Sequence, residues 1–161
     1  MNKKNYILIT IALFVITSGT VLFFYHSANQ AQILSCQSRH TLLHSGFTLD
    51  ATYSFIFGEK DGELNINGIA TEDGESHQVS RLIHYSYHKE RSVYSLQSTN
   101  VEYLSRDNSR DSNVDHHYLS FFREKGKALT LKIERDIHGV PVIYMHDIPI
   151  FYCGKRDKNQ P

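Results

Sequence analysis

Apolar and polar side chains alternate over most of the chain after residue 46. In residues 47–57 apolar and aromatic side chains occupy every second position, and four of the five positions between them are polar: Thr48, Asp50, Thr52 and Ser54. Successive side chains of a β-strand point to opposite faces, so this pattern predicts a strand with one buried face. The same alternation recurs in residues 63–70, 77–88 and 92–98, with turns rich in Gly, Asp and Glu between the segments.

The C-terminal third continues with shorter segments of the same type. We expect further strands at residues 116–124, 127–137, 140–147 and 149–153. The polar segment 105–113 reads as a loop with nothing to bury, and residues 28–45 are compatible with a short helix after the N-terminal run. Seven or eight short strands indicate a mainly β fold, namely one small antiparallel meander, sandwich or barrel.

The N-terminal run differs from the rest of the chain because it is apolar without alternation. Residues 6–25 carry no charge and are bracketed by two tyrosines, and Lys3 and Lys4 precede them. A helix of this length spans about 30 Å, the thickness of the hydrocarbon core of a bilayer. The positive-inside rule places the preceding lysines in the cytoplasm. We therefore expect a single transmembrane helix at 6–25.

This topology predicts three parts: a cytoplasmic tail at 1–5, the membrane helix, and an exported β-rich domain at 26–161, which the family resemblance described below places in the periplasm of a bacterial inner-membrane protein. A cleaved signal peptide is the competing interpretation. The apolar run is long for a signal sequence, and "HSANQAQ" offers no convincing small-x-small cleavage pair. The five-residue tail is too short to bind DNA or to carry an enzyme, so function is expected outside the membrane or through a partner within it.

Composition narrows the function further. The 161 residues contain 17 Lys and Arg and 17 Asp and Glu, so no basic excess indicates direct nucleic-acid binding.

Cys36 and Cys153 are the two cysteines, and both lie on the predicted exported side, where disulfides persist. A bridge between them would stabilise the domain by up to ~5 kcal/mol. A redox switch or a metal pair is less favoured because no C-x-x-C spacing is present.

Catalytic and metal motifs are weak. Residues 61–72 have the acidic skeleton of a calcium loop, but Ile66 stands where such a loop needs glycine, so a polar hairpin is the better interpretation. The chain lacks a G-x-S-x-G nucleophile motif, and a serine–histidine–aspartate set could be chosen from any sequence this rich in serine and histidine. We therefore expect no enzyme and no cofactor.

Histidine is the unusual residue, with ten copies. On a strand, His84 and His88 lie about 13 Å apart, too far to share one metal ion. His116 and His117 would point to opposite faces, and no spacing favours a metal site assembled from several strands. Because imidazole titrates near pH 6.5, these four histidines are candidate acid sensors. The alternative is that they are solvated surface residues.

The inward aromatic side chains suggest a second type of site. Five of them share the predicted buried face: Tyr53, Phe55, Phe57, Tyr85 and Tyr87. They could form a plain packed core, which small barrels usually have, or line a pocket for a bile salt or fatty acid.

The chain resembles the FidL-like membrane proteins. The resemblance rests on the tiny tail, the single anchor, the β-rich exported domain, the hairpin and strand "GELNINGIATEDGESHQVSRLIHYSYH", and the terminal "PIFYC". Within that family it is most similar to the PsaF and MyfF type of accessory regulator of fimbrial (pH 6 antigen type) operons. The family has no catalytic residues to carry over.

The resemblance implies a partner and a role. Such proteins act beside a membrane-anchored transcription activator of the ToxR type (PsaE or MyfE type), as ToxS acts beside ToxR. The exported domain stabilises or tunes the activator, and for the fimbrial regulators the cues are acidity and temperature. A fimbrial assembly factor is a further alternative.

Overall fold

The computed structural model describes residues 13, 16–20, 34–44, 46–110 and 112–154, and the chain divides into two compact units, 1–32 and 33–161. In the first unit, Leu13 and residues 16–20 are helical. Most of the predicted membrane helix at 6–25 lies outside the described residues. Within the part of the chain that the structure describes, no helix is long and apolar enough to cross a membrane.

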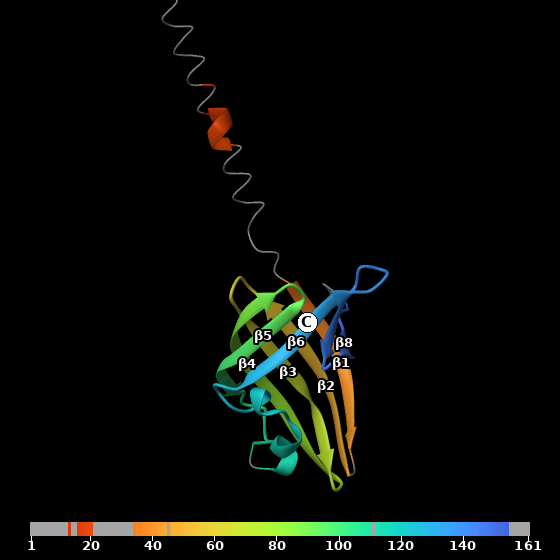
Figure 1. The fold of residues 1–161 in the computed structure, drawn as a ribbon. Coiled ribbons are helices and arrows are strands. Elements are labelled where there is room, and N and C mark those ends of the chain that lie inside the picture. Colours follow the sequence, from red (N-terminus) through yellow and green to blue (C-terminus); the bar gives the residue numbers. More distant parts are fainter. Residues whose placement is uncertain (1–12, 14–15, 21–33, 45, 111, 155–161) are drawn as a thin grey trace, which may run out of the picture. The chain divides into compact units, whose positions relative to one another are not determined.

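The second unit is built on one antiparallel sheet of eight strands (Figure 1). Each strand pairs with its neighbours in sequence, so the topology is a meander. The strands are β1 (Leu34–His44), β2 (Phe47–Phe57), β3 (Asp61–Glu72), β4 (Glu75–Glu90), β5 (Val93–Tyr103), β6 (Ala128–Arg135), β7 (Pro141–Met145) and β8 (Ile148–Tyr152). The predicted mainly β, antiparallel fold is thus confirmed.

Alternation along the strands places the core. In β2 every second side chain from Phe47 to Phe57 is buried, and the side chains between them are partly or fully exposed. Short hairpins join the strands: Asp73 and Gly74 between β3 and β4, and His146 and Asp147 between β7 and β8, all have positive φ. Two left-handed residues match the right-handed twist of the flanking strands, which is why these tight turns fit here.

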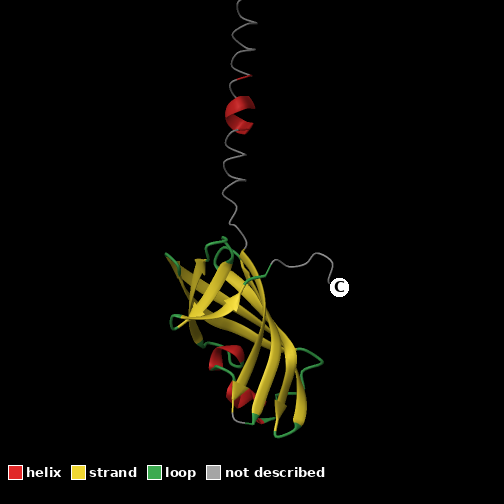
Figure 2. Cartoon of the chain, turned by 90° about the vertical axis from the view of Figure 1, so that its right-hand side faces the viewer, coloured by secondary structure: helices red, strands yellow, loops and turns green. Residues whose placement is uncertain are grey.

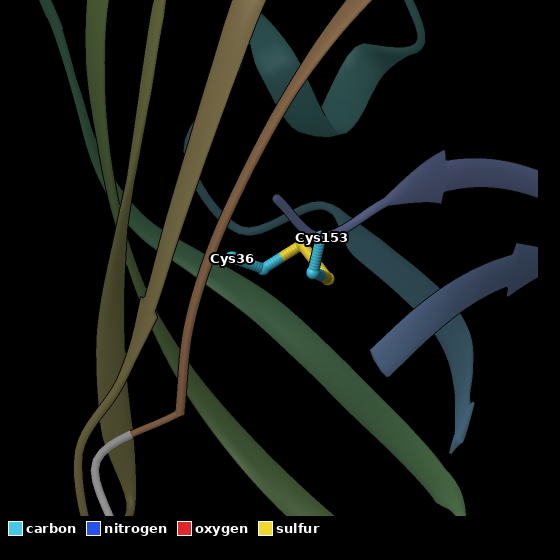
Figure 3. The surroundings of a disulfide bond; sticks show 2 residues. All are labelled: Cys36 and Cys153. Carbon is cyan, nitrogen blue, oxygen red and sulfur yellow. A yellow bond between two sulfur atoms is a disulfide. The ribbon is translucent and has the colours of Figure 1, made fainter. Parts of the chain in front are cut away.

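The sheet curls so that its first and last strands meet (Figure 2). The backbone N–H of Gly154 donates to the carbonyl of Gln37 at 3.0 Å. Beside this bridge, Cys36 on β1 and Cys153 after β8 form a disulfide with their Cα atoms 4.5 Å apart (Figure 3). The predicted pairing of the two cysteines is confirmed, and the bond joins the two outer strands of the sheet.

Two short 3-10 helices cover the interior where the C-terminal strands are short. They are η1 (Asn113–His117) and η2 (Ser120–Phe122), and Figure 2 shows them beside one end of the sheet. Val114, Phe121 and Phe122 are buried there against the core. The strand predicted at 116–124 is therefore wrong. Phe121 and Phe122 are adjacent and both buried, which a two-residue period does not allow but a tight helical turn does.

Two further expectations are corrected. The helix considered for 28–45 is wrong for its described part, because residues 34–44 form β1. Polar and exposed side chains in the second half of β1 hid the alternation, although Cys36, His40 and Leu42 sit opposite buried residues of β2. The loop 105–113 does bury side chains: Ser109 is fully buried, and so is the side chain of Asp107.

Candidate functional site

The predicted histidines lie in different settings. His84 lies on β4 between two carboxylates, with its Nδ1 3.4 Å from Glu63 Oε1 on β3 and its Nε2 3.4 Å from Glu102 Oε1 on β5. The β3–β4 register places Glu63 directly opposite His84. All three side chains are partly exposed, so this is a row of titratable groups on the outer face of three neighbouring strands.

His117 makes a closer set of contacts. Its Nε2 lies 3.0 Å from Glu72 Oε1 at the end of β3. The imidazole stacks on Phe47 of β2 with ring centroids 4.0 Å apart, and the His44 ring of β1 is 5.9 Å away. One histidine of η1 therefore contacts three strands. Protonation would turn the contact with Glu72 into an ion pair at the point where η1 joins the sheet.

The other two candidates have no such contacts. His88 lies near the end of β4 and His116 lies on η1, and both are exposed. Among the described residues, neither forms an ion pair with a carboxylate. The expectation that His116 and His117 occupy opposite faces of a strand is wrong, since both belong to η1. The described residues also contain no cluster of three or more His, Cys, Asp or Glu that could hold a metal ion.

The strongest electrostatic feature is a buried cluster around Arg81, which the sequence reasoning missed. Arg81 lies on β4, and its side chain is fully buried. Its Nε is 3.2 Å from Asp107 Oδ2, its Nη2 donates to Ser109 Oγ at 2.6 Å, and the same nitrogen bonds Asp115 of η1. The guanidinium also lies over the ring of Tyr103, with its Cζ 4.7 Å from the ring centroid.

The cluster fastens the irregular segment 105–118 to the sheet. Asp107 Oδ2 accepts the backbone N–H of Ser80 at 2.9 Å, and Asp115 Oδ2 accepts the Tyr103 hydroxyl at 2.7 Å. Burial and the hydrogen bond to Asp115 raise the pKa of Tyr103 to about 12. Tyr118 packs on the other side, with its ring centroid 4.6 Å from Arg81 Cζ, and burial raises the pKa of its hydroxyl.

A sequence signal for this cluster exists. Arg81 shares the inward face of β4 with Val79, Ile83 and Tyr85, all of which are buried. A charged residue on an apolar strand face requires a buried partner, because an unpaired charge is costly in the interior. The nearby polar segment 105–113 contains such partners. The expectation that this loop buries no side chains was therefore wrong.

The aromatic side chains considered as pocket lining lie in the core. Tyr53, Phe55, Phe57 and Tyr85 are buried, and Tyr87 is partly buried. Phe57 contacts the rings of Tyr85 and Tyr87 at centroid distances of 5.6 Å in each case. Their part in ligand binding stays a prediction.

A surface pocket of about 570 Å³ lies elsewhere, between η2, β6 and the β7–β8 turn. Apolar side chains dominate its lining, among them Leu119, Leu131 and Met145, and Lys132, His146 and Asp147 add charge or polarity.

Comparison of the chain with models of protein families, with curated proteins and with solved structures finds no match. The resemblance to the FidL-like proteins therefore stays a prediction.

Proposed function

We propose that the protein is a non-enzymatic accessory regulator of the bacterial inner membrane. Its periplasmic β domain stabilises or tunes a ToxR-like membrane-bound transcription activator of a fimbrial operon, and acidity and temperature are its cues. Two features of the sequence support this proposal: the predicted anchor at 6–25 and the resemblance to the FidL-like proteins. The proposed function includes no direct contact between this protein and nucleic acid.

One observation carries the acid response. His117 bonds Glu72 and stacks on Phe47, so a single titratable ring connects η1 with the β2–β3 part of the sheet. The His44 ring is a second titratable group packed against the His117 ring. In a separate place on the sheet, Glu63 and Glu102 flank His84. An imidazolium ion attracts these carboxylates more strongly than neutral imidazole does, so acid favours the arrangement in which they are close.

The test is a comparison of cells with and without the protein at pH 6 and pH 7.5. The measured quantities are the level of the adjacent membrane activator and the output of its promoter. We expect both to fall without this protein, with the larger fall at pH 6. Unchanged activator level and promoter output at both pH values would show that the protein is not an accessory regulator.

A periplasmic binding site for a bile salt or fatty acid is the second candidate. The pocket between η2, β6 and the β7–β8 turn favours it, because its volume of about 570 Å³ lies in the range typical of small-molecule sites. Its mostly apolar lining suits the apolar body of such a ligand. A raised melting temperature of the full-length protein in the presence of deoxycholate or oleate would support this function, and substitution of Leu119, which lines the pocket and is 48% exposed, by Asp should abolish the shift.

A further inference from the structure

Two buried polar atoms of the Arg81 cluster have no hydrogen-bond partner among the described residues. They are Nη1 of Arg81 and the hydroxyl oxygen of Tyr118. Arg81 is fully buried, and Tyr118 is only 7% exposed. The guanidinium lies over the Tyr118 ring, with its Cζ 4.6 Å from the ring centroid. The two unpartnered atoms therefore belong to side chains that are in direct contact.

The other nitrogens of Arg81 have partners. Its Nε bonds Asp107, and its Nη2 bonds both Ser109 and Asp115. Nη1 carries two N–H donors, because arginine stays protonated in proteins. A buried donor without a partner bears the full cost of losing its water, so native structures rarely keep one. Nη1 and the Tyr118 hydroxyl therefore call for a hydrogen-bond partner that the described side chains do not supply.

The charges already present decide which kind of partner fits. At neutral pH the carboxylates of Asp107 and Asp115 face a single guanidinium, so the cluster holds one negative charge in excess. A further anion would be repelled by the two carboxylates, and a cation would be repelled by Arg81. The partner is therefore neutral, and it needs an oxygen atom that accepts from Nη1.

The surroundings favour a very small partner. Tyr103 covers the guanidinium with its ring centroid 4.7 Å from Arg81 Cζ, and Tyr118 covers the other side. The ring of Phe122 is 6.4 Å from the rings of both Tyr118 and Tyr53, measured between centroids. Aromatic side chains thus occupy the space around the two unpartnered atoms. Water is the smallest neutral group that can both accept from Nη1 and bond a hydroxyl.

Tyr53 of β2 is a further polar group close to this place. Burial is the main reason why the pKa values of Tyr53 and Tyr118 are raised. The Tyr53 hydroxyl also raises the pKa of Tyr118, and Arg81 lowers both values. The three groups therefore act on one another inside the sheet, where few other polar side chains are found.

We propose that Arg81 Nη1 and the Tyr118 hydroxyl form a buried binding site for one neutral oxygen ligand, a water molecule. The water accepts a hydrogen bond from Nη1 and shares a second one with Tyr118. Buried waters typically make about three hydrogen bonds and are costly to remove. With this water, all three nitrogens of Arg81 hold the segment 105–118, at Asp107, at Asp115 and at Tyr118.

The first test is urea unfolding of the full-length Tyr118→Phe variant. If a water bridges the hydroxyl, its loss removes one hydrogen bond and leaves the water with one partner fewer. We then expect the folding equilibrium constant to fall about fivefold. If the hydroxyl is dry and unpaired, removing it makes the variant as stable as the wild-type protein or more stable, and this result would overturn the proposal. The matched control is Tyr152→Phe, at a position 59% exposed, which should leave the midpoint unchanged.

The second test is a crystal structure of the full-length protein that resolves ordered waters. We expect one isolated oxygen peak at hydrogen-bonding distance from both Arg81 Nη1 and the Tyr118 hydroxyl. A direct bond from either atom to a protein group, with no peak between them, would refute the water site. Density larger than one atom would show a different ligand, and an anomalous peak in crystals soaked in bromide would show an anion. Either of these results also contradicts the proposal, and the wild-type structure decides if Tyr118→Phe does not fold.

Discussion

Arg81 of β4 and Asp115 of η1 are bonded to each other across 34 residues of chain. This contact joins the regular sheet to the irregular segment that covers its interior. Asp107, whose side chain is fully buried, completes the pairing of the guanidinium. The Arg81 side chain is therefore one of the groups that hold η1 against the sheet.

Substitution of Arg81 by Met is expected to destabilise the domain by about 3–5 kcal/mol, because it leaves buried carboxylates without their cation. Urea unfolding of the full-length protein, followed by circular dichroism, measures this loss. The matched control is Arg39→Ala, which removes an exposed ion pair with Asp50 and should leave the unfolding midpoint nearly unchanged. A small effect of Arg81→Met would mean that the cluster is not a stability determinant.

Removal of the disulfide is expected to cost up to ~5 kcal/mol, because the bond closes a loop over a sequence separation of 117 residues. The Cys36→Ser/Cys153→Ser variant and the reduced wild-type protein should show the same lower urea midpoint. The double variant should not respond to reductant. An unchanged urea midpoint for both the double variant and the reduced wild-type protein would show that the disulfide contributes little to the stability of the fold.

Alkaline pH should destabilise the domain through its buried tyrosines. Burial raises the pKa of Tyr53 to about 12, and the pKa of Tyr103 is raised to the same value. A folded-state pKa above the ordinary value of about 10 stabilises the fold below pH 10, and this contribution is lost as pH rises toward 12. Absorbance at 295 nm should therefore show a group of phenols that ionise together with unfolding.

The Tyr103→Phe variant checks the assignment. It should remove one phenol from the group that ionises late, whereas Tyr152→Phe, at an exposed position, should leave that group unchanged. A titration in which all tyrosines ionise before the circular dichroism signal changes would contradict the prediction.

Gly68 is expected to be intolerant of a side chain. A Cβ built there would lie 2.3 Å from the Asp50 carbonyl and 2.5 Å from the Cα of Ala51, which is backbone that cannot move aside easily. Gly68→Ala should destabilise by about 1–3 kcal/mol. Gly154→Ala is the control, because its nearest contact is an ordinary 3.6 Å from the Gln37 carbonyl. Equal unfolding midpoints for the two variants would contradict the close approach of β2 and β3.

The histidine contacts divide the four candidate acid sensors into two pairs. His84→Gln/His117→Gln removes the rings that contact carboxylates, and it should abolish the difference in activator level between pH 6 and pH 7.5. His88→Gln/His116→Gln replaces exposed rings without such contacts and should preserve the difference. The opposite result would assign acid sensing to the exposed pair. Both variants should be compared at equal levels of the protein in the cell.

Strands with a strict two-residue period could be predicted from the sequence, since in β2 to β5 the buried face repeats without interruption over most of their length. The predicted count of seven or eight strands agrees with the structure for partly wrong reasons, because residues 116–124 contain the end of η1 and all of η2, and because β1 was missed. At Phe121 and Phe122 tertiary packing overrides the alternation. In β1 the apolar residues Leu42 and Leu43 are exposed, and this removes the usual signal.

The site was less predictable than the fold. The disulfide was predicted from two cysteines near the ends of a domain expected to be exported, but which histidines meet carboxylates depends on strand register. Glu63, His84 and Glu102 come from three strands, and Glu72 meets His117 across 45 residues. Arg81 could have been recognised as a charge on an apolar face, yet its partners lie in a loop without a regular pattern and in the short helix η1.

The sequential strand order has a consequence for the order in which the domain can assemble. Each strand from β2 onward can pair with the strand made just before it, so the sheet can grow as the chain is synthesised. The Arg81 cluster can form only after residue 115 has emerged, and the disulfide only after Cys153. Oxidation is thus the last step available to the nascent domain, and until it occurs the first strand has no fixed neighbour on its outer side.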